Sequence, residues 1–260
     1  MLARSAAGVI TVASDDAWGK SAAWHRTHTT TGVADMSIFR RTLADSRPRM
    51  DRYALVKRTL DYAVALLAVL LTLPVWAAVA LAIKLDSRGP VFFRQTRVGK
   101  DGRLFTVYKF RTMHVNNDDS IHRAYMAALM ADGEASEMVN GTPVFKLQND
   151  PRVTRAGRIL RKTSLDELPQ LLNVLRGEMS LVGPRPALPY EVEQYQPWQR
   201  ARLNATPGIT GLWQVYGRSR VTFEEMVRMD ITYTETRSLG QDLKLIVLTV
   251  PVMVFGIGGA

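Results

Sequence analysis

The amino-acid sequence predicts a mainly helical α+β protein that is attached to a membrane through one apolar helix. Three observations carry this prediction. The run Tyr62–Ile83 has 22 residues without a charge, two β-rich runs flank a turn at Lys100–Gly102, and leucines recur at helical spacing from Leu168 to Leu175. The first run is long enough for a membrane helix, the second pattern predicts a β-hairpin, and the third predicts a helix with one apolar face.

Composition narrows the classes of function. The chain has 260 residues, a formal net charge of +10 and no cysteine, which excludes disulfides, thiolate metal sites and cysteine nucleophiles. The positive charge favours a polyanionic neighbour such as nucleic acid, anionic lipid or a phosphorylated small molecule. The apolar run and the lack of a helix-turn-helix or RNP signature argue against nucleic acid, so we expect no nucleic-acid partner.

Pro74 lies just past the middle of the apolar run, where a proline bends a helix. Arginines and lysines flank both ends of the run, and the positive-inside rule draws both ends to the cytoplasmic side. The residues alone leave two alternatives open. One is a helix that spans the membrane, and the other is a re-entrant helix that is broken at Pro74.

The rest of the chain divides by composition. We expect residues 1–50 to be a poorly ordered N-terminal extension, residues 51–88 to form the membrane helix, whether spanning or re-entrant, and residues 89–260 to carry the chemistry. Within the last part, Ser120–Met130 predicts a short helix in a polar insertion. The apolar stretch Leu243–Ala260 is interrupted by a proline, which predicts C-terminal helices lying on the membrane surface.

The adjacent acids Asp166 and Glu167 are the strongest candidates for chemistry. Ser164 and Glu167 have the spacing of a capping box, so one interpretation is that the acids only complement a helix N-terminus. The other interpretation is a phosphate site, because guanidinium groups bind phosphate bidentately and stay charged. In that site, one acid would attack phosphorus and the other would bind Mg²⁺. The cations near the acids in the sequence are Arg158, Arg161, Lys162, Arg176 and Arg185.

Two aromatic residues, Trp213 and Tyr216, follow a glycine-rich turn. They allow either stacking on a nucleobase or sugar, or ordinary packing at a membrane interface. The sequence leaves both open.

Taken together, these motifs resemble the bacterial sugar transferase family, the monotopic polyprenyl-phosphate phosphoglycosyl transferases that begin exopolysaccharide, capsule and O-antigen assembly. The resemblance covers about residues 51–260, and this chain resembles the small, minimal members. The matching segments, in chain order, are KRTLDYAVALLAVLLTLP (Lys57–Pro74), Lys84–Met113, LRKTSLDELPQLLNVLRGEMSLVGPRP (Leu160–Pro186) and PGITGLWQVYGRS (Pro207–Ser219).

The resemblance implies a re-entrant helix, broken at Pro74, with both ends cytoplasmic. It further implies that Asp166 is a nucleophile that attacks the sugar-linked phosphorus of a UDP-sugar, expels UMP and passes the sugar phosphate to a polyprenyl phosphate. Glu167 would bind Mg²⁺, with Asp166 as a second candidate ligand. The residues expected to bind substrate phosphates are Lys109, Arg111, Arg161 and Arg185.

The implied partners are a UDP-sugar donor, a polyprenyl (undecaprenyl) phosphate acceptor and membrane lipid. The implied location is the bacterial inner membrane, with the active site on its cytoplasmic face. The sequence does not identify the sugar, and it leaves the oligomeric state open, a homodimer included. Two other hypotheses are a non-catalytic membrane scaffold and a one-step glycosyltransferase that releases UDP.

Overall fold

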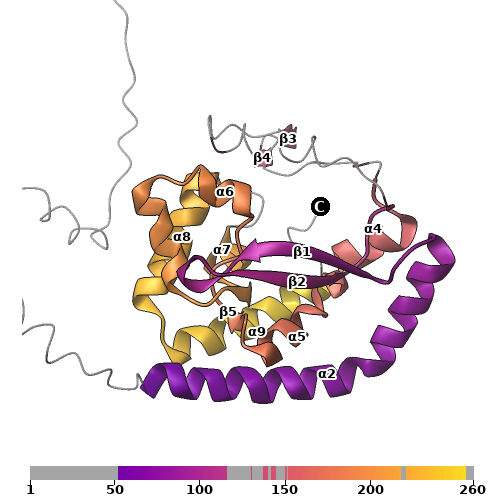
Figure 1. Cartoon of the computed structure of the whole chain (residues 1–260), viewed down its shortest axis with the longest axis horizontal. Coiled ribbons are helices and arrows are strands. Elements are labelled where there is room, and N and C mark those ends of the chain that lie inside the picture. Colours follow the sequence, from indigo (N-terminus) through magenta and orange to yellow (C-terminus); the bar gives the residue numbers. More distant parts are fainter. Residues whose placement is uncertain are drawn as a thin grey trace, which may run out of the picture. The chain divides into compact units, whose positions relative to one another are not determined.

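The computed structural model describes residues 52–115, 130, 137–139, 142–144, 150, 152–217 and 221–255, all within the unit Met50–Ala260 (Figure 1). The other unit, Met1–Arg49, lies outside the described residues, as does the helix expected over Ser120–Met130 apart from Met130. The described part is mainly helical with small β-sheets, as the sequence predicts.

The apolar run forms the middle of α2 (Arg52–Asp86), a continuous helix of 35 residues. Among the described helices, it is the one that is long and apolar enough to cross a membrane. Figure 1 shows that α2 is bent, and Pro74 lies inside it, so the expected break is a bend rather than an interruption. The Thr72 hydroxyl donates to the carbonyl of Ala68 (2.6 Å), an interaction that favours bending, and it accepts the indole N–H of Trp76 (3.1 Å).

The two β-rich runs pair as antiparallel strands, β1 (Phe92–Val98) and β2 (Leu104–Phe110). The connection is a 3₁₀ turn at Lys100–Gly102. It places Asp101 and Gly102 at positive φ (56° and 78°), a conformation that aspartate tolerates and glycine adopts without steric cost. The residue types of the turn therefore explain why the chain reverses here.

The remaining strands form two further sheets. β3 (Glu137–Val139) pairs antiparallel with β4 (Thr142–Val144), and β5 (Ser180–Val182) pairs in parallel with β6 (Gly208–Thr210). The helices after the first sheet are α4 (Arg155–Lys162), α5 (Gln170–Arg176), α6 (Pro189–Glu193), α7 (Leu212–Tyr216), α8 (Phe223–Thr236) and α9 (Leu239–Phe255), with 3₁₀ helices at Leu165–Glu167 and Pro197–Asn204.

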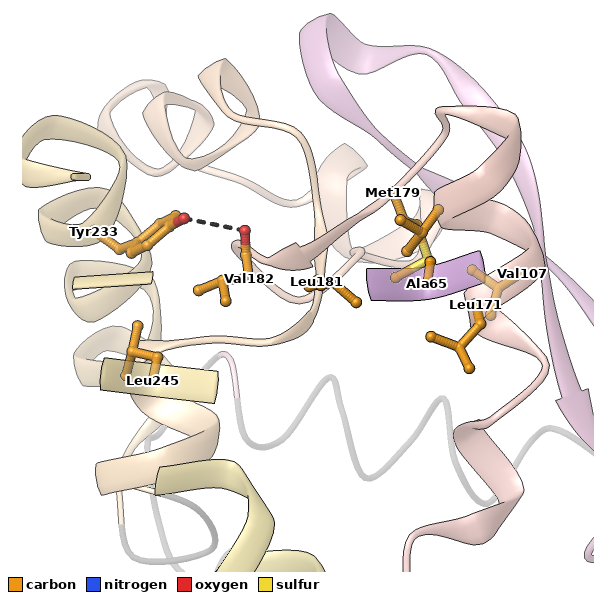
Figure 2. Packing of buried hydrophobic residues seen from close by; sticks show 9 residues of the cluster. Ala65, Val107, Leu171, Met179, Leu181, Val182, Tyr233 and Leu245 are labelled. Carbon is orange, nitrogen blue, oxygen red and sulfur yellow. Dashed lines mark hydrogen bonds between the residues drawn. The ribbon is translucent and has the colours of Figure 1, made fainter. Parts of the chain in front are cut away.

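The predicted leucine stripe lies on α5, which is central to the hydrophobic core. The helix ends at Gly177, whose φ of 80° makes a left-handed C-cap. Leu171 and Val174 are buried against side chains from distant parts of the chain (Figure 2). That cluster also contains Ala65, Val107, Met179, Leu181, Val182, Tyr233 and Leu245.

A single buried amide fastens α5 to the sheet. Asn173 is fully buried, and its side-chain oxygen accepts the backbone N–H of Tyr108 (3.1 Å). Its side-chain nitrogen donates to the carbonyl of Thr106 (2.7 Å). These bonds satisfy polar backbone groups of β2 and fix α5 beside it.

The C-terminal helix α9 has two different faces. Leu245 is buried in the core cluster, whereas Leu243, Val247 and Val250 are exposed. The helix continues through Pro251. The apolar C-terminal stretch is therefore helical as far as Phe255, with one face packed on the domain and the other apolar and uncovered.

Candidate active site

The two candidate acids lie on the short 3₁₀ turn Leu165–Glu167, between α4 and α5. Ser164, which precedes the turn, has a left-handed backbone (φ 55°), and its side chain makes no capping hydrogen bond. Helix α5 begins only at Gln170. The capping-box interpretation is therefore wrong. A non-glycine residue at positive φ stores strain, which proteins concentrate at functional sites, and Asp166 follows two residues later.

Glu167 forms an ion pair with Lys109 of β2, with Oε1 and Nζ 2.6 Å apart. Burial by itself would raise the pKa of the Glu167 carboxyl, but the positive charges of Lys109, Arg185 and Arg97 outweigh burial and lower it. Glu167 is therefore ionised at neutral pH.

Asp166 has the opposite shift. Its side chain is buried, with the residue 8% exposed, and this burial raises its pKa to about 6. The charges of Lys109 and Arg161 oppose the rise, and the negative charge of Glu167 adds to it. Two neighbouring carboxyls with pKa values pushed apart are typical of sites that divide chemical roles between two acids.

Glycines let one loop pack closely against the segment around β6. The loop Gly183–Pro186 follows β5, and its backbone touches the segment around β6. A Cβ on Gly208 would lie 2.0 Å from the nitrogen of Gly183, and a Cβ on Gly211 would lie 2.3 Å from the Gly183 carbonyl oxygen. The N–H of Gly208 also donates to the carbonyl of Pro184 (2.8 Å). Glycine is required where two backbones approach this closely.

The loop presents Arg185 to a recess that contains Glu167. The Arg185 guanidinium lies 6.0 Å from the ring centre of Trp213, and it makes no ion pair within the part of the chain that the structure describes. Tyr216, the other aromatic residue considered for ligand stacking, is 53% exposed. The polar side chains that line the recess are Arg97, Lys109, Glu167, Gln170, Arg185 and Gln214.

Of the four predicted phosphate-binding residues, Lys109 and Arg185 line this recess. Arg161 lies beside it: its charge acts on Asp166, and its Nε donates to the hydroxyl of Thr112 (3.1 Å). Three other cations near the acids in the sequence, Arg158, Lys162 and Arg176, are exposed and do not line the recess.

Arg111 has a different place from the one predicted. Its buried guanidinium donates to the carbonyls of Ser87 (2.7 Å) and Arg88 (2.6 Å), at the C-terminal end of α2. The C-terminal end of a helix carries partial negative charge, so an arginine is stabilised near it. The structure thus places Arg111 at the end of α2, and it does not line the recess with Lys109 and Arg185.

Arg97 lines the recess but was not predicted from the sequence. It is 8% exposed. Burial is the main cause that lowers the pKa of its guanidinium to about 10, and the nearby positive charge of Arg185 is the second cause. The pairing of the two strands would have identified Arg97 as a residue of this site. Gln95 pairs with Val107 and Arg97 with Phe105, so Arg97 shares a face of the sheet with Lys109.

The opposite pKa shifts of the two acids predict opposite effects on stability. Because the folded-state pKa of Asp166 is raised, its ionisation opposes folding above about pH 6 and has no effect below about pH 4. Asp166→Asn is expected to stabilise the protein by about 2 kcal/mol at pH 8, and the gain should shrink as the pH falls towards 4. Thermal unfolding in detergent at several pH values measures this.

Glu167→Gln is the matched comparison. Its ionised form is stabilised by the surrounding cations, so the substitution removes the negative charge that lies 2.6 Å from the Lys109 ammonium and should lower the unfolding temperature at pH 8. Shifts of the same sign in the two variants would contradict the electrostatic description of the pair.

Comparison with known proteins gives a consistent match. The family model described as bacterial sugar transferase matches residues 52–256. The galactosyl transferase CpsE of Streptococcus agalactiae is 42% identical over 211 residues, which cover 79% of this chain and 44% of that protein. This chain therefore spans less than half of that relative's length.

Two other relatives are closer in length. The exopolysaccharide production protein ExoY of Rhizobium meliloti is 41% identical over 197 residues, covering 76% of this chain and 84% of ExoY. The UDP-glucose:undecaprenyl-phosphate glucose-1-phosphate transferase of Caulobacter vibrioides is 46% identical over 204 residues, covering 75% of this chain and 68% of that protein.

Proposed function

Because the chain belongs to the bacterial sugar transferase family, we propose that it transfers a sugar 1-phosphate from a UDP-sugar to a polyprenyl phosphate and releases UMP, as the first membrane step of an exopolysaccharide, capsule or O-antigen pathway. The observation that carries this proposal is the recess. There Glu167 lies among the cations Lys109, Arg97 and Arg185, and the buried Asp166 is adjacent to it in the chain. This arrangement suits a reaction in which a carboxylate attacks a phosphate whose charge the cations balance.

The proposed chemistry has two displacements at one phosphorus. In the first, a carboxylate oxygen of Asp166 bonds to the sugar-linked phosphorus, and the bond from that phosphorus to the bridging oxygen breaks, so UMP leaves with the electron pair. In the second, a phosphate oxygen of the polyprenyl phosphate bonds to the same phosphorus and Asp166 leaves. The product is polyprenyl diphosphate-sugar. A pKa of about 6 leaves Asp166 mostly ionised at neutral pH and more basic than an ordinary aspartate, which suits a nucleophile.

The cations of the recess hold the substrate phosphates in this proposal. Arg185 is available because its guanidinium packs on Trp213 without a carboxylate partner among the described residues. Lys109 holds Glu167 and thereby keeps Asp166 as the acid that is free to attack. Arg97, in strand β1, adds a further positive charge to the lining of the recess.

We also propose that Mg²⁺ acts here, with Glu167 and Asp166 as its protein ligands. The donor chemistry fits, because Mg²⁺ takes oxygen ligands and commonly uses one or two carboxylates together with substrate phosphates and water. The described residues contain no cluster of three or more acids or histidines that would form an all-protein cage. When bound, the ion would neutralise phosphate charge and ease the departure of UMP.

The fastening of α2 supports a re-entrant helix. Near its N-terminal end, Tyr53 and Lys57 both donate to the carboxylate of Asp242 on α9 (2.9 Å each). One turn further, Asp61 is buried and accepts the N–H of Leu181 in β5 (3.2 Å).

The other end of α2 is tied to the same domain. Asp86 accepts the N–H of Ala156 at the start of α4 (2.9 Å), and Arg111 binds the carbonyls of Ser87 and Arg88, which directly follow the helix. Between the two ends, the helix exposes a row of leucines, each more than half exposed: Leu66, Leu67, Leu70, Leu71 and Leu73.

A helix whose ends both pack on one domain does not place those ends on opposite faces of a bilayer. We therefore propose that the bent middle of α2 enters the membrane from the cytoplasmic side, where flanking basic residues remain. The exposed apolar face of α9 would lie on the same surface. The recess then stands at headgroup level, where the phosphate of a polyprenyl acceptor is held while its tail stays in lipid.

The proposal is tested by nucleotide release. Purified protein in nanodiscs is supplied with Mg²⁺, undecaprenyl phosphate and a panel of UDP-sugars. Release of UMP from at least one donor, stopped by EDTA, is the expected result, and the active donor names the sugar. Release of UDP would indicate one-step glycosyl transfer and overturn the role of Asp166. No nucleotide from any donor would favour a scaffold.

A further inference from the structure

A buried ion pair lies directly behind the loop that presents Arg185. Arg202, on the 3₁₀ helix Pro197–Asn204, pairs with Asp230 of α8, and their side chains are only 2% and 1% exposed. Arg202 also donates from Nη1 to the hydroxyl of Tyr195 (2.7 Å). A pair buried this deeply loses its hydration, and replacing such pairs with apolar residues is often neutral or stabilising. Fold stability therefore gives a weak reason for its presence.

The same guanidinium reaches the substrate-facing loop. Nη2 of Arg202 donates to the backbone carbonyl of Arg185 (3.2 Å). The next carbonyl along the loop, that of Pro186, accepts from Nη1 of a second buried arginine, Arg97 (3.0 Å). Two arginines from separate elements thus hold successive carbonyls of one loop, with Asp230 fixing the first of them.

We propose that Arg202, oriented by Asp230, is a positioning residue that acts through Arg185: it holds the loop so that the Arg185 guanidinium stays in the recess above the acids. The two prolines of the loop limit its own hydrogen bonding. Two prolines fix φ on either side of Arg185 but provide no N–H for hydrogen bonds. Backbone bonds hold the start of the loop, where Gly183 donates to Thr210 and Pro184 accepts from Gly208. From Arg185 onward, the carbonyls of Arg185 and Pro186 are both bound by buried cations.

The effect of Arg202 on catalysis rests on the proposed function, whereas its effect on the position of the loop does not. Arg202 does not line the recess, so its effect on a substrate must pass through the loop. Arg97 lines the recess as well as holding the loop, and for that reason it does not separate positioning from binding. The informative substitution is Arg202→Lys, which keeps a positive charge beside Asp230 but cannot serve three acceptors with a planar fork.

Hydrogen exchange gives the first arm of the test and needs no substrate. Arg202→Lys is expected to speed backbone exchange in the peptide spanning residues 183–188 by about fivefold or more, because the loop loses an anchor. The matched control is Arg228→Lys, on α8, whose pair with Glu224 is exposed (side chains 65% and 59%) and which should leave the loop unchanged. Equal loop exchange in the two variants would overturn the proposal.

Kinetic coupling gives the second arm. Arg202→Lys should lower kcat/KM for the UDP-sugar about tenfold, since small misplacements of a phosphate-binding group are costly. In an Arg185→Ala background, the same change should alter kcat/KM less than about twofold, because both substitutions remove one function. If the loss of kcat/KM in the double variant equals the product of the two single losses, Arg202 acts independently of Arg185, and the proposal is overturned.

Two controls distinguish failure of the proposed function from failure of the Arg202→Lys variant to fold. If the wild-type protein releases no UMP from any donor, the proposed function fails, and the exchange arm still decides whether Arg202 holds the loop. If Arg202→Lys does not fold, Tyr195→Phe removes one of the three acceptors and keeps both charges. It should show the same local exchange effect at smaller amplitude, and no effect would overturn the proposal.

Discussion

Without a lipid acceptor, the protein is expected to release about one UMP for each active site and then stop, with the sugar phosphate retained on Asp166. The first displacement needs only the donor, and the second needs the polyprenyl phosphate, so the covalent intermediate accumulates when the acceptor is left out. Rapid-quench measurement of UMP, together with the intact mass of the protein, reports both halves of the prediction. Addition of undecaprenyl phosphate should then discharge the intermediate.

The Asp166→Asn variant is expected to show no burst and a loss of turnover of about 10⁴-fold or more, because the amide oxygen is a far weaker nucleophile. Asp101→Asn is the matched control. Asp101 is an exposed acid in the turn between β1 and β2, at a left-handed φ of 56° that asparagine also tolerates. A burst that survives in Asp166→Asn, or UMP that appears only when the lipid is present, would contradict a covalent intermediate on this residue.

The burst should also depend on pH in a defined direction. With the pKa of Asp166 raised to about 6 by burial, the nucleophile is ionised above that pH and protonated below it. The rate of the first displacement is therefore expected to be constant near neutral pH and to fall about tenfold per pH unit below about 6. A rate that stays constant down to pH 4.5 would show that the ionisation of Asp166 does not control the step.

The second large effect concerns the fastening of α2. Asp242→Asn is expected to lower the free energy of unfolding by about 3 kcal/mol. The Asp242 carboxylate accepts from Tyr53 (2.9 Å), Lys57 (2.9 Å) and Tyr233 (2.6 Å), and it is buried. An asparagine would replace one of the two accepting oxygens with an N–H₂ group that cannot accept a hydrogen bond, and it would leave the Lys57 ammonium with Asp61 at 4.0 Å as its nearest carboxylate. Thermal unfolding in detergent measures the loss.

A double substitution identifies the cause. Lys57→Met with Asp242→Leu removes both charges, so its loss of stability should be smaller than that of Asp242→Asn alone. Glu224→Gln, in the exposed pair with Arg228, is the control and should change stability by less than about 0.5 kcal/mol. If Asp242→Asn is as mild as this control, the buried group is not what holds the N-terminal end of α2 to the domain.

The features predicted correctly from the sequence are those that local chemistry decides. The apolar run folds as a helix because nothing in it favours another structure apart from one proline, and the Lys100–Gly102 turn reverses the chain because its residues accept positive φ. Gly177 ends α5 for the same reason. The prediction of a capping box was wrong because Ser164 itself takes the left-handed conformation, a choice that its spacing from Glu167 does not reveal.

The residues of the candidate site were likewise predicted correctly in part. Asp166, Glu167, Lys109 and Arg185 were identified from motifs, and the structure brings the last three to one recess with Asp166 buried beside them. Arg111 stands two residues from Lys109, yet it lies at the end of α2 instead, because residues two apart share a face of a strand only as far as the strand runs, and β2 ends at Phe110.

By itself, the sequence determined a bent apolar helix, a hairpin, a leucine-striped helix and an acid pair rich in neighbouring cations. The tertiary structure alone decided which cations meet the acids, that Asp166 and Glu167 have opposite pKa shifts, and that buried groups tie both ends of α2 to one domain. The physical reason is that helices, turns and strands follow from contacts a few residues apart. Burial and charge at a site depend on groups such as Asp242 and Lys57, which lie 185 positions apart and meet only in the folded chain.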